Sequence, residues 1–241
     1  MKAGIISAGF NSRLSSAGKP KGLVEINGKT IIENKIDYLQ RAGFHEIYFV
    51  IREKSHELDI YLNKIKKNYF INLKIIKYNS VSPLDSTFAF SKYLKKDEGI
   101  LVFNVDAIFE YKDLEKFSLE MKKAKKNKNT DMIMWASPIL KGINEDPAYI
   151  KFDDNLMVTE YGKSINPTNY VFGQIRYCSH KILNLCNDMS NNKDYRMNSF
   201  IKYLIQSKYA VSVFKTVGYT YDIDTPEDLN NVKKLKNDRR L

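Results

Sequence analysis

Cysteine, long apolar runs and acidic residues are scarce in this sequence of 241 residues. The only cysteines are Cys178 and Cys186, too few for a fold stabilised by disulfides, and their spacing is not that of a zinc site. No stretch approaches the roughly 18–20 apolar residues of a transmembrane helix. The apolar segment at the N-terminus is too short for a signal peptide. We therefore expect a cytoplasmic protein with reduced thiols.

The shortage of acidic residues leaves a basic protein. Lys and Arg number 39 against 28 for Asp and Glu, a formal net charge of +11, which raises the question of nucleic-acid binding. That function calls for basic side chains interleaved with exposed aromatic rings. The lysine run at residues 122–128 contains no aromatic residue and is typical of a solvated helix end. We therefore expect no nucleic-acid partner.

Strand-like and helix-like segments alternate through the first 136 residues. This alternation predicts a parallel sheet with helices on both faces. One of the helices is expected to be capped by Asp85 or Ser86 and to run to Leu94. The other expected elements are strands at 3–8, 23–26, 47–51, 73–76, 99–103 and 131–136, and helices at 30–42, 58–65 and 114–124.

The pattern changes after Pro147. Apolar runs at 148–152 and 156–161 flank an Asp-Asp-Asn turn, which predicts a hairpin. Thr225 and Pro226 mark the start of a last helix, as N-cap and first helical residue. No repeat or long linker divides the chain, so we predict a single α/β domain (1–241), a Rossmann-like three-layer sandwich with a mostly parallel mixed sheet and a small late β-hairpin insertion. Strands are also expected at 170–177, 211–214 and 219–223, and helices at 181–185 and 199–205.

A loop rich in Gly, Ser, Lys and Pro follows the first strand, at residues 9–22. A glycine-rich turn after a strand exposes backbone N–H groups, which bind anions. Arg13, Lys19 and Lys21 add three cationic side chains within nine residues. Arginine binds phosphate oxygens bidentately, whereas lysine acts as a mobile point charge. The loop therefore indicates a phosphate site, with an ordinary solvated loop as the alternative.

Two widespread phosphate-loop motifs are absent from this loop. The Walker pattern G-x-x-x-x-G-K-[ST] fails because Pro20 follows Gly18 and Lys19. The dinucleotide pattern G-x-G-x-x-G fails because Gly9 is followed by Phe10 and Asn11. The phosphate site must therefore be of another type.

The same loop resembles that of the sugar-phosphate nucleotidyltransferases. Their signature, A-G-x-G-x-R-L followed by a variable loop and P-K, is matched by residues 8–14 (AGFNSRL) and by Pro20-Lys21. The next stretch, residues 23–32, is also similar to this family. Asn11 replaces the second glycine, and Asn tolerates positive φ better than most residues. The resemblance extends over the chain to the last helix.

Two aspartates match the metal-binding positions of that family. Asp106 follows the apolar strand 99–103, and the carboxyl ends of parallel strands are where open α/β sheets bind ligands. A structural cap is the alternative for a lone aspartate there. Asp222 lies in Y-D-I-D-T-P-E-D-L, which is similar to the second metal motif. The resemblance implies Mg²⁺ held by these two carboxylates.

A third similarity concerns the acceptor. Residues 162–169 and Gly173 are similar to the E-K-P-x-x-P-x-S-N segment and following glycine that bind the acceptor in the family. Gly162 replaces the family's glutamate, with Glu160 nearby. A solvated hairpin lysine is the alternative for Lys163. The implied acceptor-binding residues are Lys163, Glu160, Asn169 and Gly173.

The resemblance implies transfer of a nucleotidyl group, with release of pyrophosphate, from a nucleoside triphosphate to a phosphorylated acceptor. The acceptor would be a sugar 1-phosphate or another phospho-alcohol such as phosphocholine, for cell-surface polysaccharide or glycoconjugate precursors. CTP, UTP, dTTP and GTP all serve relatives. Residues 1–110 would bind the nucleotide and 111–241 the acceptor. The implied catalytic residues are Arg13 and Lys21, and the implied nucleotide-binding residues are Ala8, Gly9, Phe10, Asn11, Ser12 and Ser86, the last with a helix cap as its alternative.

A glycosyltransferase of related fold is the alternative enzyme class. Such enzymes carry a D-x-D metal motif after a strand in the middle of the chain. Asp222 and Asp224 have that spacing but lie too late, and Asp106 stands alone at the expected position. The cationic side chains of Arg13 and Lys21 also have no purpose in that reaction.

Overall fold

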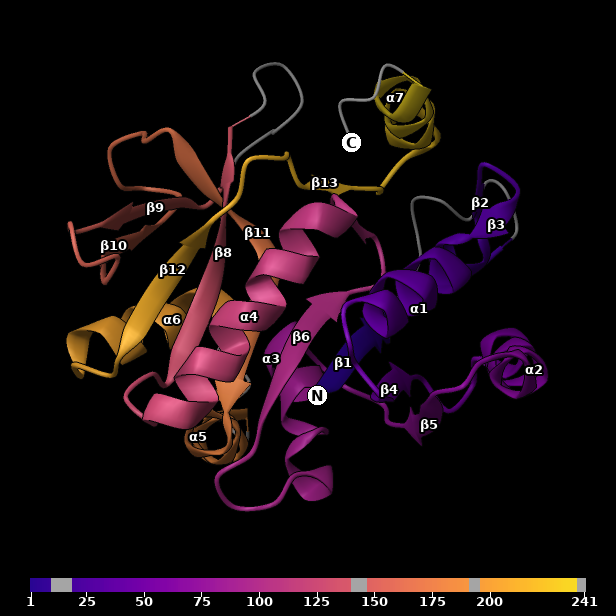
Figure 1. The fold of residues 1–241 in the computed structure, drawn as a ribbon, viewed down its shortest axis with the longest axis horizontal. Helices are drawn as coiled ribbons and strands as arrows, with labels where there is room; N and C mark the ends of the chain where they lie inside the picture. Colours follow the sequence, from indigo (N-terminus) through magenta and orange to yellow (C-terminus); the bar gives the residue numbers. More distant parts are fainter. Residues whose placement is uncertain (10–18, 140–146, 191–195, 238–241) are drawn as a thin grey trace.

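A mixed sheet forms the middle layer of the computed structural model (Figure 1). The structure describes residues 1–9, 19–139, 147–190 and 196–237. Four strands on one side of the sheet run parallel in the order β5-β4-β1-β6, which puts their carboxyl ends at one edge. Their bounds are β1 (Lys2–Ser7), β4 (Glu46–Ile51), β5 (Asn72–Lys77) and β6 (Gly99–Asn104).

The other side of the sheet is built around β11 (Tyr170–Ser179). This strand pairs antiparallel with β6 and with β8 (Met132–Pro138), and β8 pairs parallel with β12 (Val211–Lys215). The hairpin of β9 (Tyr149–Phe152) and β10 (Val158–Gly162) joins through β11, which confirms the predicted late hairpin. Two strands, β10 and β11, run against the others, which makes the sheet mixed.

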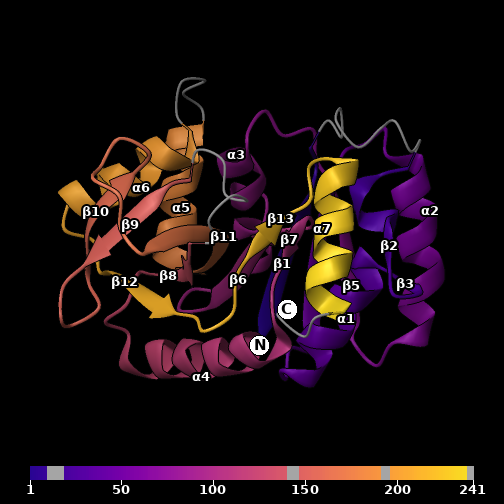
Figure 2. The same ribbon diagram turned by 90° about the horizontal axis from the view of Figure 1, so that it is seen from above.

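Helices cover both faces of the sheet, as predicted. Figure 2 shows α1 and α4 on one side, and α3, α5 and α6 on the other. A hydrophobic core fills the space on each face of the sheet, and alternate side chains of β6 enter the two cores. Leu101 and Phe103 pack in the core beneath α1 and α4, whereas Ile100 and Val102 pack in the core beneath α3, α5 and α6. The helices are α1 (Ile31–Arg41), α2 (His56–Ile65), α3 (Pro83–Phe88), α4 (Tyr111–Asn127), α5 (His180–Ser190), α6 (Met197–Gln206) and α7 (Pro226–Asn237).

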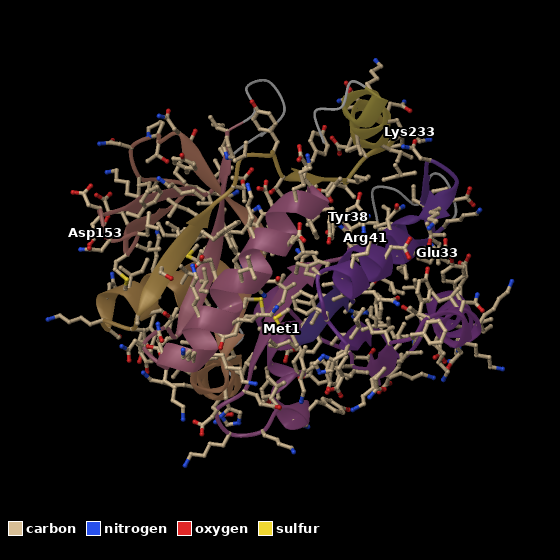
Figure 3. All side chains as sticks on the ribbon, viewed as in Figure 1. Met1, Glu33, Tyr38, Arg41, Asp153 and Lys233 are labelled. Carbon is tan, nitrogen blue, oxygen red and sulfur yellow. The ribbon has the colours of Figure 1, made fainter. Side chains whose placement is uncertain are left out.

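Polar caps and ring contacts fix the helices that flank the site. Thr30 forms a capping box with Glu33 at the start of α1. Tyr38 and Arg41, labelled on α1 in Figure 3, both pack on the Tyr111 ring of α4, with the guanidinium carbon 4.0 Å from the ring centre. These contacts lock α1 against the start of α4.

The predicted start of α3 is wrong. Ser82, and neither Asp85 nor Ser86, is the N-cap, because its hydroxyl accepts the backbone N–H of Asp85 at 3.1 Å and Pro83 takes the first helical position. The helix also ends earlier than predicted, at Phe88. Thr225 does cap α7 as predicted, accepting the N–H of Asp228 at 3.2 Å.

Two of the predicted strands are much shorter than expected. The segment 23–26 is a short 3₁₀ helix, Lys21–Leu23, followed by β2 (Glu25–Ile26), which pairs with β3 (Lys29–Thr30). The segment 219–223 contains only β13 (Tyr221–Asp222), paired with β7 (Ala107–Ile108), a strand that was not predicted. Within the described ranges, no helix is both long and apolar enough to cross a membrane.

Candidate active site

A cleft of about 440 Å³ opens at the carboxyl ends of β1 and β6. Ligands of open α/β sheets bind at this edge. Of the predicted site residues, Ala8, Gly9, Lys21, Ser86 and Asp106 all line the cleft. Four other predicted residues, Phe10, Asn11, Ser12 and Arg13, lie outside the described residues.

Lys21 reaches the floor of the cleft from its 3₁₀ helix. The next residue, Gly22, packs so closely on α1 that an added Cβ would lie 2.7 Å from the Ile32 side chain, so this segment is held against the helix. The Lys21 ammonium donates hydrogen bonds to Asp106 Oδ2 at 2.8 Å and to Asp224. Burial lowers the pKa of Lys21, but these two carboxylates outweigh it and the net pKa is raised.

The pairing of β13 with β7 brings the second predicted metal ligand beside the Asp106 segment, although Asp222 is buried and does not itself line the cleft. Asp222 lies opposite Ala107, the residue that follows Asp106 in the sequence. The N–H of Ile223 donates to the Asp106 carbonyl at 3.2 Å. Burial raises the pKa of Asp222 to about 8, and the charges of Asp106 and Asp224 add to the effect. An excess of negative charge therefore gathers around one lysine.

Oxygen atoms beside the cleft that lack hydrogen-bond partners within the described ranges suit a hard divalent cation. Two buried oxygens, Asp222 Oδ1 and Asn104 Oδ1, have no hydrogen-bond partner in the described parts of the chain. Within those parts, no three His, Cys, Asp or Glu side chains lie close enough to form an all-protein metal cage. Two carboxylates, completed by substrate phosphates and water, is the donor set that Mg²⁺ usually takes.

A wall of hydroxyl groups faces these acids. Ser86 is 2% exposed and donates to Ser80 Oγ at 2.7 Å and to the Ser82 carbonyl. Arg52 joins this wall to the end of the first strand, because its guanidinium donates to the carbonyls of Ala8, which follows β1, and of Ser80, each at 3.2 Å. The wall and the end of β1 are thus parts of one hydrogen-bonded frame.

The predicted acceptor residues lie elsewhere, on β10, on β11 and on the segment between them. Glu160 forms an ion pair with Lys151 across the hairpin, at 2.9 Å. Gly173 is buried, and an added Cβ would lie 2.7 Å from Thr220 Oγ1. Lys163 and Asn169 are exposed. The lining of the cleft, as far as the structure describes it, includes none of the four residues, so the acceptor site stays a prediction.

The backbone gives a reason for Gly162, which replaces the glutamate of the resembling family. Its φ is +141°, a region that favours glycine, and an added Cβ would lie 2.9 Å from Lys202 Cε on α6. A glutamate would be strained here. Glycine is therefore matched to the backbone conformation at this position.

Several residues of the site were not predicted. Arg52 and Asn104 stand at the carboxyl ends of β4 and β6, so the strand-end rule that singled out Asp106 would have found them. Asp224 has the D-x-D spacing that was set aside as too late in the chain. Gln174, which donates to Asp222, lies inside a strand and carries no such signal.

Comparisons with known proteins agree with this geometry. A family model described as "MobA-like NTP transferase domain" matches residues 3–130. CTP:phosphoglutamine cytidylyltransferase from Campylobacter jejuni is 34% identical over 113 residues, and that match spans about half of each protein, 45% of both lengths. D-glycero-alpha-D-manno-heptose 1-phosphate guanylyltransferase from the same organism is 26% identical over 95% of this chain and 96% of its own length.

A solved structure confirms the fold. The inositol-1-phosphate CTP transferase from T. maritima superposes with a TM-score of 0.80 and 19% sequence identity, over 98% of this chain and 94% of the other. The whole described architecture, including the late strands that carry Asp222, therefore has a counterpart in a known fold.

Proposed function

Because the chain belongs to the family of MobA-like NTP transferase domains, we propose that it is a nucleotidyltransferase. It would join a nucleoside monophosphate from a triphosphate to a phosphorylated small molecule and release pyrophosphate. One observation above all supports this: Lys21 is held between Asp106 and Asp224, beside the buried Asp222, in the cleft at the strand ends. This arrangement supports the proposal because it brings together a cation for the phosphates and carboxylates for a metal ion.

The proposed reaction is one displacement at phosphorus. An oxygen of the acceptor phosphate attacks the α-phosphorus and forms the new P–O bond. The bond to the β-phosphate oxygen breaks, and its electron pair leaves with pyrophosphate. No covalent enzyme intermediate is needed, so positioning and charge stabilisation account for the rate.

Lys21 would supply a cation to this reaction. Its raised pKa keeps the ammonium charged at neutral pH. Asp106 and Asp224 hold the ammonium in the cleft before substrate binds, which limits the reorganisation required in the transition state. Arg13 is proposed to bind the β- and γ-phosphates, as the resemblance implies.

Asp106 and Asp222 would hold a divalent cation, for which we propose Mg²⁺. When bound, the cation neutralises phosphate charge and polarises the α-phosphate. The orphaned Asp222 Oδ1 supports this assignment, because a buried carboxylate oxygen without a donor is costly unless a cation compensates it. The two side chains also come from distant parts of the chain, so the fold itself assembles the pair.

Ser86 and the neighbouring hydroxyl groups would bind the nucleoside. The acceptor would be bound by Glu160, Lys163, Asn169 and Gly173. The relatives' names include a cytidylyl- and a guanylyltransferase, acting on a phosphorylated amino acid derivative and on a sugar 1-phosphate. We accordingly propose a sugar phosphate or another phospho-alcohol, such as phosphocholine, as acceptor. A cytoplasmic role in making surface polysaccharide precursors, and the halves 1–110 and 111–241, stay predictions.

The glycosyltransferase alternative is less well supported by the geometry. Its D-x-D motif would present Asp222 and Asp224 to one cation. Here the buried Ile223 separates them: Asp222 accepts from Gln174, whereas Asp224 accepts from Lys21.

A pyrophosphate-release assay tests the proposal. CTP, GTP, UTP and dTTP are each supplied with Mg²⁺ and a panel of phosphorylated acceptors, and pyrophosphate is measured with and without the acceptor. We expect acceptor-dependent release with one preferred base. Release of a nucleoside diphosphate from a nucleotide sugar, with no pyrophosphate from any triphosphate, would establish the alternative instead.

A further inference from the structure

β11 contains an irregularity directly beneath the proposed metal site. Phe172 pairs with Ala136 and Arg176 with Met134, so three residues of β11 lie opposite one residue of β8. Within this bulge Gln174 has φ +58°, a left-handed conformation that is uncommon for a residue with a side chain. Strained bulges of this kind recur beside functional sites, where they redirect a side chain.

The bulge directs the Gln174 amide to the buried Asp222 and to Asn104, which lines the cleft. Its Nε2 donates to Asp222 Oδ2, and its Oε1 accepts from Asn104 Nδ2 at 2.6 Å. The amide nitrogen of Gln174 can only donate and its oxygen can only accept, so these two bonds fix which end of the amide faces Asp222. The Asn104 amide is then fixed in turn, with its oxygen turned away from Gln174.

Two oxygen atoms of these residues take no part in the hydrogen bonds to Gln174, and both lack any hydrogen-bond partner within the described part of the chain. Asp222 Oδ1 and Asn104 Oδ1 are both buried and have no partner in the described residues. The Gln174 amide thus bonds one oxygen of Asp222 and the nitrogen of Asn104. The other oxygen of Asp222 and the oxygen of Asn104 stay available as acceptors. Oxygen atoms of this kind are the ligands of a hard cation.

The bulge is itself held from the other side of the sheet. Arg176 is 2% exposed, and its guanidinium donates to the Gln174 carbonyl at 3.5 Å and to Thr87 on α3. Gly173 allows the bulge to lie against the segment that precedes Asp222, where an added Cβ would lie 2.7 Å from Thr220 Oγ1. The backbone is therefore constrained on both sides of Gln174.

We propose that Gln174 is a positioning residue for the metal site, which orients the Asp222 carboxylate and the Asn104 amide so that each presents an oxygen to the cation. This inference rests on the proposed function, since it assumes a cation at Asp106 and Asp222. Residues that orient metal ligands usually change metal affinity by 10–100-fold when replaced.

Titration with Mn²⁺, followed by the EPR signal of the free ion, tests the proposal without any substrate. Gln174→Met removes both hydrogen bonds and nearly preserves volume. Gln174→Gly also removes them but relieves the left-handed backbone, so its melting temperature in EDTA should be no lower than that of wild type. Gln206→Met makes the same chemical change at an exposed position at the end of α6 and is the matched control.

We expect both Gln174 variants to bind Mn²⁺ about 10-fold or more weakly, with Gln206→Met unchanged. A loss of affinity in Gln174→Gly without a loss of stability separates positioning from a general role in folding. Wild-type affinity in either folded variant, or no Mn²⁺ binding by the wild type, would overturn the proposal. A protein that shows the expected affinities but transfers no nucleotide would contradict the proposed function alone.

Discussion

Replacing Lys21 by alanine removes a cation that contacts both Asp106 and Asp224. If the ammonium stabilises charge on the α-phosphate in the transition state, its loss should cost about 3–4 kcal/mol, the usual effect of removing one preorganised donor. At about 1.4 kcal/mol per factor of ten, kcat should fall by roughly 10²–10³. The side chain is 13% exposed, so solvent cannot replace it at no cost.

Steady-state release of pyrophosphate at saturating triphosphate and acceptor measures this effect. Lys29→Ala is the matched control, because Lys29 also forms a close ion pair, with Asp37 at 2.6 Å, but on the hairpin outside the cleft. The control should keep wild-type turnover. A Lys21→Ala enzyme within a few-fold of wild type would refute the assignment of Lys21 to the reaction.

The same variant should show an altered dependence of stability on pH. The pKa of Lys21 is raised, so its stabilising effect is complete at neutral pH and is lost only as pH rises through that raised pKa. Without the ammonium, the carboxylates of Asp106, Asp222 and Asp224 repel one another when ionised. The melting temperature of Lys21→Ala in EDTA should therefore fall further below wild type at pH 8 than at pH 5.

Three other predictions concern single residues. Asp222 has a pKa of about 8 in the folded state, so the stability of the wild type should decline as pH rises from about 4 to 8. Calorimetry at pH 8 in EDTA should therefore show Asp222→Asn to be more stable than wild type. The same variant should lose transfer activity. Thr30→Ala breaks the capping box and should cost about 1 kcal/mol in urea unfolding with turnover retained. Ser86→Ala should raise KM for the triphosphate several-fold, with kcat little changed.

Strand-end logic accounts for much of what the sequence predicts about the site. Lys21 and Asp106 come together because a loop after β1 and the end of β6 meet at the same edge of the sheet. Arg52 obeys the same rule at the end of β4 and was overlooked for lack of a motif around it. The rule depends only on parallel pairing, which local apolar periodicity reveals well.

Long-range pairings of short segments could not be predicted. β7 and β13 have two residues each, too few for a periodic signal, yet their pairing brings Asp222 to Asp106. The turn of Gln174 toward Asp222 depends on a bulge set by the neighbouring strand. Nor did spacing reveal the roles of Asp222 and Asp224, because their separate partners, Gln174 and Lys21, come from distant parts of the chain.

Isotope transfer tests the central claim, nucleotidyl transfer to the acceptor phosphate, most directly. The acceptor is prepared with ¹⁸O in its phosphate and incubated with the preferred unlabelled triphosphate. Mass spectrometry then measures the ¹⁸O content of the products. Attack at the α-phosphorus predicts that all of the label stays in the coupled product and none enters pyrophosphate. Two results would contradict the proposed mechanism. One is labelled inorganic phosphate released from the acceptor, and the other is a coupled product whose bridging oxygen between the two phosphorus atoms carries no label.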